Sequence, residues 1–329
     1  MSQSRSGASH SVTWKLHLAI LICALAYPFL FTSNFAINLG VMALFYALIG
    51  QSWNLSGGFA GQLSFGHVGF FGFGAYASTI LQLRYGVSPW LGLPAAALAG
   101  AASAGFVAIL SFRAGLKGSY FALITLAFVE VFKIISNSVE FTGAGLGLLI
   151  PKKIGFENFQ FKDRLAFYLI ILILTALSVA TAEWLRRSRF GARLAAIREN
   201  EEAAQALGID VFTEKVKIML LSGAVCGTGG CFFAQYFLYI DPSIAFGLDK
   251  SVEMLLVSMI GGQGTVYGPL LGSILLAILS EGTRSISQVQ GLSLVLYGGL
   301  LIVIIAFLPH GLIELFKKIK PSQSRGTDA

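Results

Sequence analysis

The chain has 329 residues, of which 55% are hydrophobic and only 12% are charged, and its formal net charge is +7. Soluble domains carry about 25% charged residues, so this composition excludes an ordinary soluble protein. The three cysteines and four histidines lack the spacing of a disulfide framework or a metal site. We therefore expect a membrane protein with no bound metal, whose basic residues set its orientation and do not bind nucleic acid.

Apolar stretches of about 20 residues recur along the chain, and each is long enough to cross a bilayer as a helix. They predict an all-α, polytopic transmembrane bundle with about ten crossings. One stretch, 251–263, is too short to cross as a regular helix. It is interpreted either as a half-helix or as part of a re-entrant pair with the next stretch. The expected crossings are 16–33, 35–55, 63–83, 89–111, 118–136, 165–186, 214–239, 251–263, 267–284 and 290–309.

Lysine and arginine in short loops mark the cytoplasmic side of a membrane protein. Five arginines between positions 186 and 198 therefore place their loop in the cytoplasm, and alternation of the crossings puts both termini on that side. The expected parts are a cytoplasmic tail at 1–15, a single transmembrane domain at 16–310 with a cytoplasmic loop at 187–213 and a periplasmic loop at 137–164, and a cytoplasmic tail at 311–329.

The first apolar stretch has a second interpretation. Its residues Ala24-Leu25-Ala26 resemble a signal-peptide cleavage site. A cleaved helix would leave the basic residues Arg5 and Lys15 without a topological role, so we favour a retained first crossing.

Two glycine-rich segments, 57–74 and 261–272, interrupt the apolar pattern. Glycine lets another backbone approach closely or lets a helix break. The segments are interpreted either as sites of close helix packing or as irregular stretches that line a solute path. The expected helix-breaking glycines are Gly57, Gly58, Gly61, Gly66, Gly261, Gly262 and Gly264.

Polar side chains at membrane depth are costly in lipid and are candidates for function. Several of them cluster near the two glycine-rich segments, whereas no nucleophile lies in a pattern with a base, so covalent catalysis has no support. The candidate solute-path residues are Gln51, Asn54, Gln62, Ser64, His67, Gln235, Glu253 and Gln263.

The stretch between Gly191 and Gly208 is predicted to form one amphipathic helix in the cytoplasmic loop. Its apolar residues Leu194, Ile197, Ala204 and Leu207 recur on one face at helical spacing. Such a helix could lie on the lipid surface or bind a protein. An anionic leaflet would repel its three clustered glutamates, which favours a protein partner.

This stretch resembles a known motif. Glu202-Ala203-Ala204-x3-Gly208 matches the EAA-x3-G core of the loop found in membrane subunits of bacterial ABC importers. The longer form of that motif has Ile ten residues after the glycine, followed by x-Leu-Pro. Here Ile218 and Leu220 fit, and Leu221 replaces the proline.

Further segments resemble the M-type permease of branched-chain amino-acid importers over roughly residues 35–310. The external segment departs from the family's TGG-x-x-GL pattern, because Ala144 replaces its second glycine. The segments are 52–76, 142–151, 196–211 and 267–273.

The resemblance implies a type II ABC importer permease in the bacterial inner membrane. Its expected partners are an H-type second permease, two cytoplasmic ATPases and a periplasmic substrate-binding protein. The chain lacks a G-x4-GK[ST] nucleotide loop, so we expect no cofactor and no enzymatic activity of its own, with ATP used by partner subunits. The residues expected to couple to the ATPase are Arg198, Glu199, Asn200, Glu201, Glu202, Ala203, Ala204 and Gly208.

The expected function is import of branched-chain or related amino acids. Urea or short amides are the nearest alternative substrates, because related permeases share these motifs. A secondary transporter or channel is the alternative mechanism, since helices broken by glycine would suit it equally well. An ATPase-docking loop argues against that mechanism, because an ion-coupled carrier has no use for it.

Overall fold

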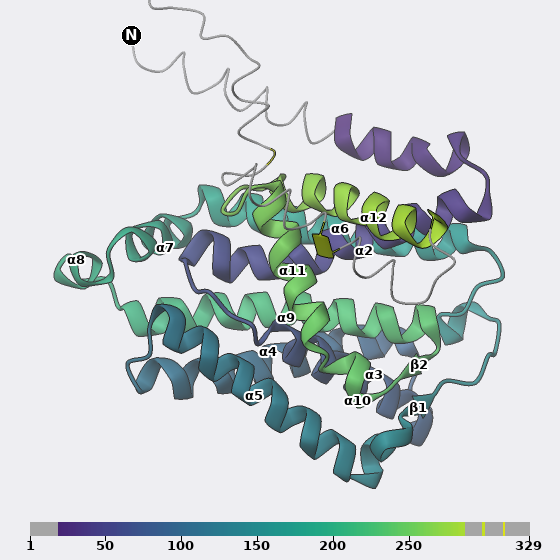
Figure 1. Ribbon diagram of the computed structural model, residues 1–329, viewed down its shortest axis with the longest axis horizontal. Helices are drawn as coiled ribbons and strands as arrows, with labels where there is room; N and C mark the ends of the chain where they lie inside the picture. Colours follow the sequence, from purple (N-terminus) through teal and green to yellow (C-terminus); the bar gives the residue numbers. More distant parts are fainter. Residues whose placement is uncertain (1–18, 287–297, 300–311, 313–329) are drawn as a thin grey trace, which may run out of the picture.

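The computed structural model describes residues 19–286 together with 298, 299 and 312 (Figure 1). Long helices that lie side by side dominate it, as the apolar pattern predicts. The predicted crossing at 290–309 lies outside the described residues apart from 298 and 299. A helix at Ala19–Leu30 comes first. It is followed by α2 (Asn34–Trp53), α3 (His67–Tyr85), α4 (Pro89–Arg113), α5 (Gly118–Ser138), α6 (Arg164–Arg187), α7 (Arg189–Glu199), α8 (Glu201–Ala206), α9 (Val211–Phe237), α10 (Pro242–Ala245), α11 (Leu248–Gly261) and α12 (Gly268–Ile286).

Within this part of the chain, five helices are long and apolar enough to cross a bilayer. They are α2 with its continuation to Gly58, α4, α5, α6 and α9. Each coincides with an expected crossing to within a few residues, because uninterrupted apolar sequence can satisfy its backbone in a membrane only as helix.

The core of the bundle forms where α9 packs against α3 and α4. Small residues allow this contact. A Cβ atom on Gly227 of α9 would overlap the carbonyl of Ala96 and approach Gly100, both on α4, and a Cβ atom on Gly74 of α3 would overlap Gly227. Close backbone approach through small residues is how helices associate when lipid competes for apolar side chains. Part of the first glycine-rich segment therefore serves packing.

The bundle has two distinct ends (Figure 1). At one end β1 (Leu148–Leu149) pairs antiparallel with β2 (Tyr239–Ile240), a small sheet that the all-α prediction did not include. At the other end lie α7 and α8. We call these the sheet end and the α8 end. Short 3₁₀ helices at Glu140–Thr142, Ala144–Leu146 and Phe156–Asn158 complete the sheet end.

Two helix breaks lie near the α8 end. After α2 the chain continues through a π-helical turn, Asn54–Gly58, and it leaves helical geometry only at Gly61, where φ is +68°. Because residues 61–66 are not helical, α3 begins at His67 and not at the predicted position 63. The second break follows Gly261, the last residue of α11.

The short segment 251–263 corresponds to α11, which has 14 residues. At about 1.5 Å per residue it is about 21 Å long, less than the roughly 30 Å of a hydrocarbon core. The chain passes from β2 at the sheet end through α10 into α11, which leads toward the α8 end. The next helix, α12, packs against α2. The helix is thus short because α10 and the turn before it cover part of the distance.

Candidate functional site

The loop between α6 and α9 folds into two short helices. Ser188 caps α7 by accepting a hydrogen bond from the Gly191 amide (3.0 Å), and Asn200 caps α8 by accepting one from the Ala203 amide (3.0 Å). Asn200 is extended, with φ −159° and ψ 111°. The prediction of one continuous helix is therefore wrong, because an asparagine side chain at this position starts a new helix.

The break at Asn200 changes which apolar residues are buried. Leu194, Ile197 and Ala204 pack into the protein as their spacing predicts, but Leu207 is 81% exposed. Gly208 ends α8 with φ +82°, a conformation that favours glycine. Sequence reasoning missed Leu207 as a surface residue. Interpreting Asn200 as a helix N-cap would have predicted that Leu207 is exposed, because residues after the cap belong to a new helix with a different buried face.

Glu201 and Glu202 have different environments. Glu201 pairs with the buried Lys215 of α9 and, at 3.2 Å, with Lys117 before α5. Burial by itself would raise the pKa of Glu201, but the hydrogen bonds and charges of Lys215 and Lys117 outweigh it and hold the pKa below its ordinary value. Glu202 is exposed. Glu201 therefore fixes α8 to the bundle, whereas Glu202 faces outward.

Arg198, the penultimate residue of α7, points into its own chain. Its Nη1 donates a hydrogen bond to the Gly58 carbonyl at 2.7 Å. Gly61 and Gly264 both have positive φ, and both pack against the Arg198 side chain. A Cβ atom added to Gly61 would lie 3.0 Å from Arg198 Cγ, and one added to Gly264 would lie 2.5 Å from Arg198 Nη1. The arginine thus contacts both glycine-rich segments at once.

The two glycine-rich segments also contact each other directly. Asn54 Nδ2 donates to the Thr265 carbonyl at 2.9 Å, and Asn54 Oδ1 accepts from the Gly264 amide at 2.8 Å. Asn54 is fully buried in the π-helical turn. Together, Asn54 and Arg198 join the end of α2, the turn after α11 and the end of α7 into one hydrogen-bonded junction, which we call the Asn54–Arg198 junction.

Several other solute-path candidates gather beside this junction. His67 Nε2 lies 2.8 Å from Ser222 Oγ and 3.1 Å from Ser56 Oγ, so Ser56 and Ser222 extend the buried polar cluster beyond the sequence prediction. The Ser64 carbonyl accepts from the Trp53 indole at 2.8 Å. Gln62 and Gln51 are also buried, and both polar atoms of the Gln51 side chain lack a partner in the described structure.

The other three candidates make contacts of their own, and Gln263 directly precedes Gly264 of the junction. Gln235 is fully buried on α9 and its Nε2 donates to Gln82 Oε1 at 2.6 Å. Glu253 pairs with Lys250 within α11 at 3.2 Å. Gln263 is exposed in the turn between α11 and α12.

Most of the expected coupling residues are exposed at the α8 end, whereas Ala204 is buried and Glu201 is half-buried in its ion pairs. Arg198, Glu199 and Asn200 end α7 and begin α8, and Glu202 and Ala203 are exposed on the first turn of α8. Arg198 and Glu199 also line a hollow of about 250 Å³ between α7 and Phe59. No group of three or more metal-ligating side chains occurs among the described residues.

A family model described as the branched-chain amino acid transport system / permease component matches residues 35–305. The chain belongs to this permease family. Two similar proteins are the LivM permeases of high-affinity branched-chain amino acid transport systems from Salmonella typhimurium and Escherichia coli K12. Each is 31% identical over 97% of this chain and 80% of its own length.

A probable LivH permease of Methanocaldococcus jannaschii is 27% identical over 75% of this chain and 82% of its own length. No solved structure matches this chain. Membership of the permease family and the five apolar helices identify a multi-pass membrane permease subunit of an importer. The resemblance predicted from the sequence motifs is thereby confirmed.

Proposed function

We propose that this chain is the M-type permease subunit of an ATP-driven importer of branched-chain amino acids. The similarity to two LivM permeases along nearly the whole chain supports this substrate class. The match to a LivH protein supports a second, H-type permease as its partner in the membrane. Two cytoplasmic ATPases and a periplasmic binding protein complete the proposed assembly, with ATP bound only by the ATPases.

In this proposal the α8 end faces the cytoplasm and the sheet end faces the periplasm. The arginines at the end of α6 and in α7 favour this orientation, because basic residues are retained on the cytoplasmic side. Both tails, 1–15 and 311–329, then lie in the cytoplasm, and residues 16–310 form one domain with about ten crossings.

One observation carries the proposed coupling role of α8. The helix is held to α9 through Glu201 and Lys215, while its other side leaves Glu202 and Leu207 exposed. A short helix that is fixed at its base and apolar at its tip is suited to enter a groove of another protein. Movement of the ATPases would then be transmitted through α8 and α7 to the Asn54–Arg198 junction.

Energetically, the ATPases drive transport only if they bind one permease conformation better than the other. In the Asn54–Arg198 junction, Arg198 joins α7 to the first helix break by one hydrogen bond and packs against Gly264 of the second. Two hydrogen bonds of Asn54 join the two breaks to each other. A shift of α7 therefore changes contacts at the ends of α2 and α11 together, which is the requirement for opening a path between helices.

Replacing Leu207 by serine tests the docking role. Because Leu207 is 81% exposed, the permease is expected to insert and fold, while loss of a buried apolar anchor at the interface is expected to weaken ATPase binding about tenfold or more. Affinity co-purification of the ATPase with the tagged permease measures this.

The matched control is Leu149→Ser, which removes a leucine that is 71% exposed at the sheet end. It is expected to leave ATPase co-purification unchanged. Equal recovery of the ATPase with Leu207→Ser and with the unaltered chain would show that α8 is not the docking element.

A further inference from the structure

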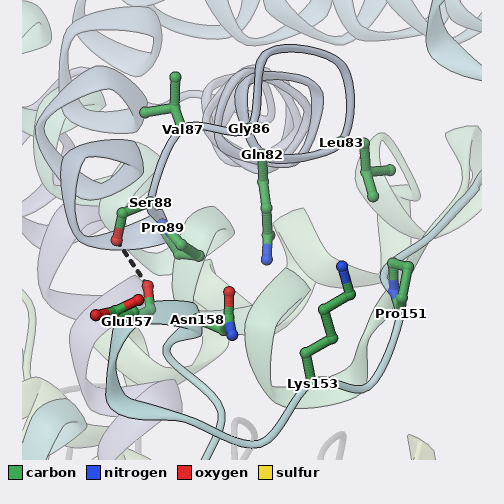
Figure 2. A pocket seen from close by; sticks show the side chains of 10 residues that line it. All are labelled: Gln82, Leu83, Gly86, Val87, Ser88, Pro89, Pro151, Lys153, Glu157 and Asn158. Atoms are coloured by element: carbon green, nitrogen blue, oxygen red, sulfur yellow. Dashed lines mark hydrogen bonds between the residues drawn. The ribbon is translucent and has the colours of Figure 1, made fainter.

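A cavity of about 340 Å³ lies at the sheet end, between the α3–α4 turn and the segment that follows β1 (Figure 2). Its size is at the low end of the roughly 300–1,000 Å³ found for small-molecule sites. The residues that line it combine apolar walls with a few polar groups, and they come from Gln82 to Pro89 on one side and from Pro151 to Asn158 on the other.

Two hydrogen-bond donors face this cavity from opposite sides. The Lys153 ammonium and the Gln82 side-chain nitrogen both point into it (Figure 2). Among the described residues no carboxylate pairs with Lys153, and the side chain of the neighbouring Glu157 is directed away from it. A carboxylate can accept hydrogen bonds from both an unpaired ammonium group and an amide N–H.

A hydrogen bond from α9 fixes the orientation of the Gln82 side chain. Its Oε1 accepts a 2.6 Å hydrogen bond from Nε2 of Gln235, which is fully buried in α9. This bond occupies the Gln82 oxygen and leaves its nitrogen free to donate into the cavity. The buried Gln235 Oε1 has no partner in the described structure, so an unsatisfied acceptor lies behind Gln82.

The remaining lining complements the other parts of an aliphatic α-amino acid. The side-chain oxygen of Asn158 faces the cavity and can accept from an ammonium group (Figure 2). Leu83, Pro89 and Pro151 supply apolar surface for an aliphatic side chain. Ser88 is already engaged, because its hydroxyl donates to the Glu157 carbonyl at 2.7 Å and holds the two sides of the cavity together.

We propose that this cavity is a periplasmic subsite that receives an aliphatic α-amino acid from the binding protein, with Lys153 and Gln82 binding its carboxylate and Asn158 binding its ammonium group. This inference rests on the proposed function and adds a location for the solute within this chain. Its affinity need only be low, because a tight site would hold the solute in the membrane and slow its release.

Thiol protection in the assembled importer tests the subsite. Leu83→Cys, in a Cys23→Ser background, places a thiol in the apolar part of the cavity lining, and the other two cysteines are buried. The labelling rate with a membrane-impermeant thiol reagent is measured in nanodiscs without binding protein, with L-leucine and with L-leucinol, which lacks the carboxylate. Leucine is expected to slow labelling, and leucinol is not.

Lys153→Gln is expected to raise the leucine concentration that gives half protection about tenfold, because it removes the positive charge that binds the carboxylate. The control Lys152→Gln removes the adjacent exposed charge, which does not line the cavity, and is expected to change nothing. Absence of protection in the parent, equal protection by leucinol, or equal protection after Lys153→Gln would each overturn the subsite.

ATP-driven leucine uptake by the unaltered chain, measured in parallel, separates this result from the proposed function. Uptake without protection rejects the subsite alone. Protection without uptake of any branched-chain amino acid rejects the proposed function and leaves the cavity as a binding site for carboxylate-bearing solutes.

Discussion

Arg198→Ala is expected to reduce ATP-driven transport about tenfold or more while the importer still assembles. The substitution removes the hydrogen bond to the Gly58 carbonyl and the packing against Gly61 and Gly264. A hydrogen bond from a charged donor is worth about 1.5–3 kcal/mol, and allosteric couplings of about 1–3 kcal/mol correspond to roughly 5- to 150-fold effects. ATP hydrolysis is expected to continue, so the ratio of solute transported to ATP hydrolysed should fall.

Arg189→Ala is the matched control, because Arg189 is an exposed arginine on the same helix with no described contact to either glycine-rich segment. Arg198→Lys should be intermediate, since lysine keeps the charge but not the planar guanidinium group. If Arg198→Ala kept the parental transport-to-hydrolysis ratio, the Asn54–Arg198 junction would have no role in coupling.

Glu201→Gln is expected to destabilise the permease and to release α8 from α9. Lys215 is only 4% exposed at its side chain and depends on Glu201 for a counter-charge. Removing one partner of a buried ion pair costs about 3–5 kcal/mol, and the low end applies because Glu201 keeps partial contact with solvent and Lys117. Thermal unfolding of the purified permease measures the loss, with Glu202→Gln as the control at the exposed neighbour.

A double substitution separates charge burial from general damage. Glu201→Leu with Lys215→Met removes both charges and is expected to recover most of the lost stability, because apolar replacement of a buried pair is often neutral or stabilising. A double variant no more stable than Glu201→Gln would contradict this account of the pair.

The pair also predicts a pH dependence. Because the folded protein lowers the pKa of Glu201 below its ordinary value of 4.5, the stabilisation is fully present above that value. It should be lost as the pH falls through the lowered pKa, and unfolding midpoints measured across acidic pH should converge for the parent and Glu201→Gln.

The sequence was sufficient to predict the helices, because long apolar runs have one backbone solution in a membrane. It also identified the permease family, since the Glu202-to-Gly208 motif is local, while the coupling role of the stretch that contains this motif stays a prediction. It did not predict that Asn200 divides this stretch, because the apolar spacing across the break imitates one helix. Asn200 is a residue type that commonly caps a helix, but the apolar spacing decided the prediction.

Contacts between distant segments could not be predicted from spacing alone. Asn54 bonds to Gly264 and Thr265, 210 and 211 residues away, so the two glycine-rich segments meet although their sequences are only loosely alike. Lys215 follows the coupling stretch with nothing in the pattern to show that it faces Glu201. The solute path through the eight polar residues remains a prediction.

Uptake of radiolabelled leucine into proteoliposomes tests the central claim most directly. The vesicles would contain this chain with its H-type partner and both ATPases, with loaded binding protein outside. The account predicts uptake that requires both ATP inside the vesicle and binding protein outside, and that stops when the ATPases are omitted. Uptake driven by a proton or sodium gradient without the ATPases would contradict it and would identify a secondary transporter.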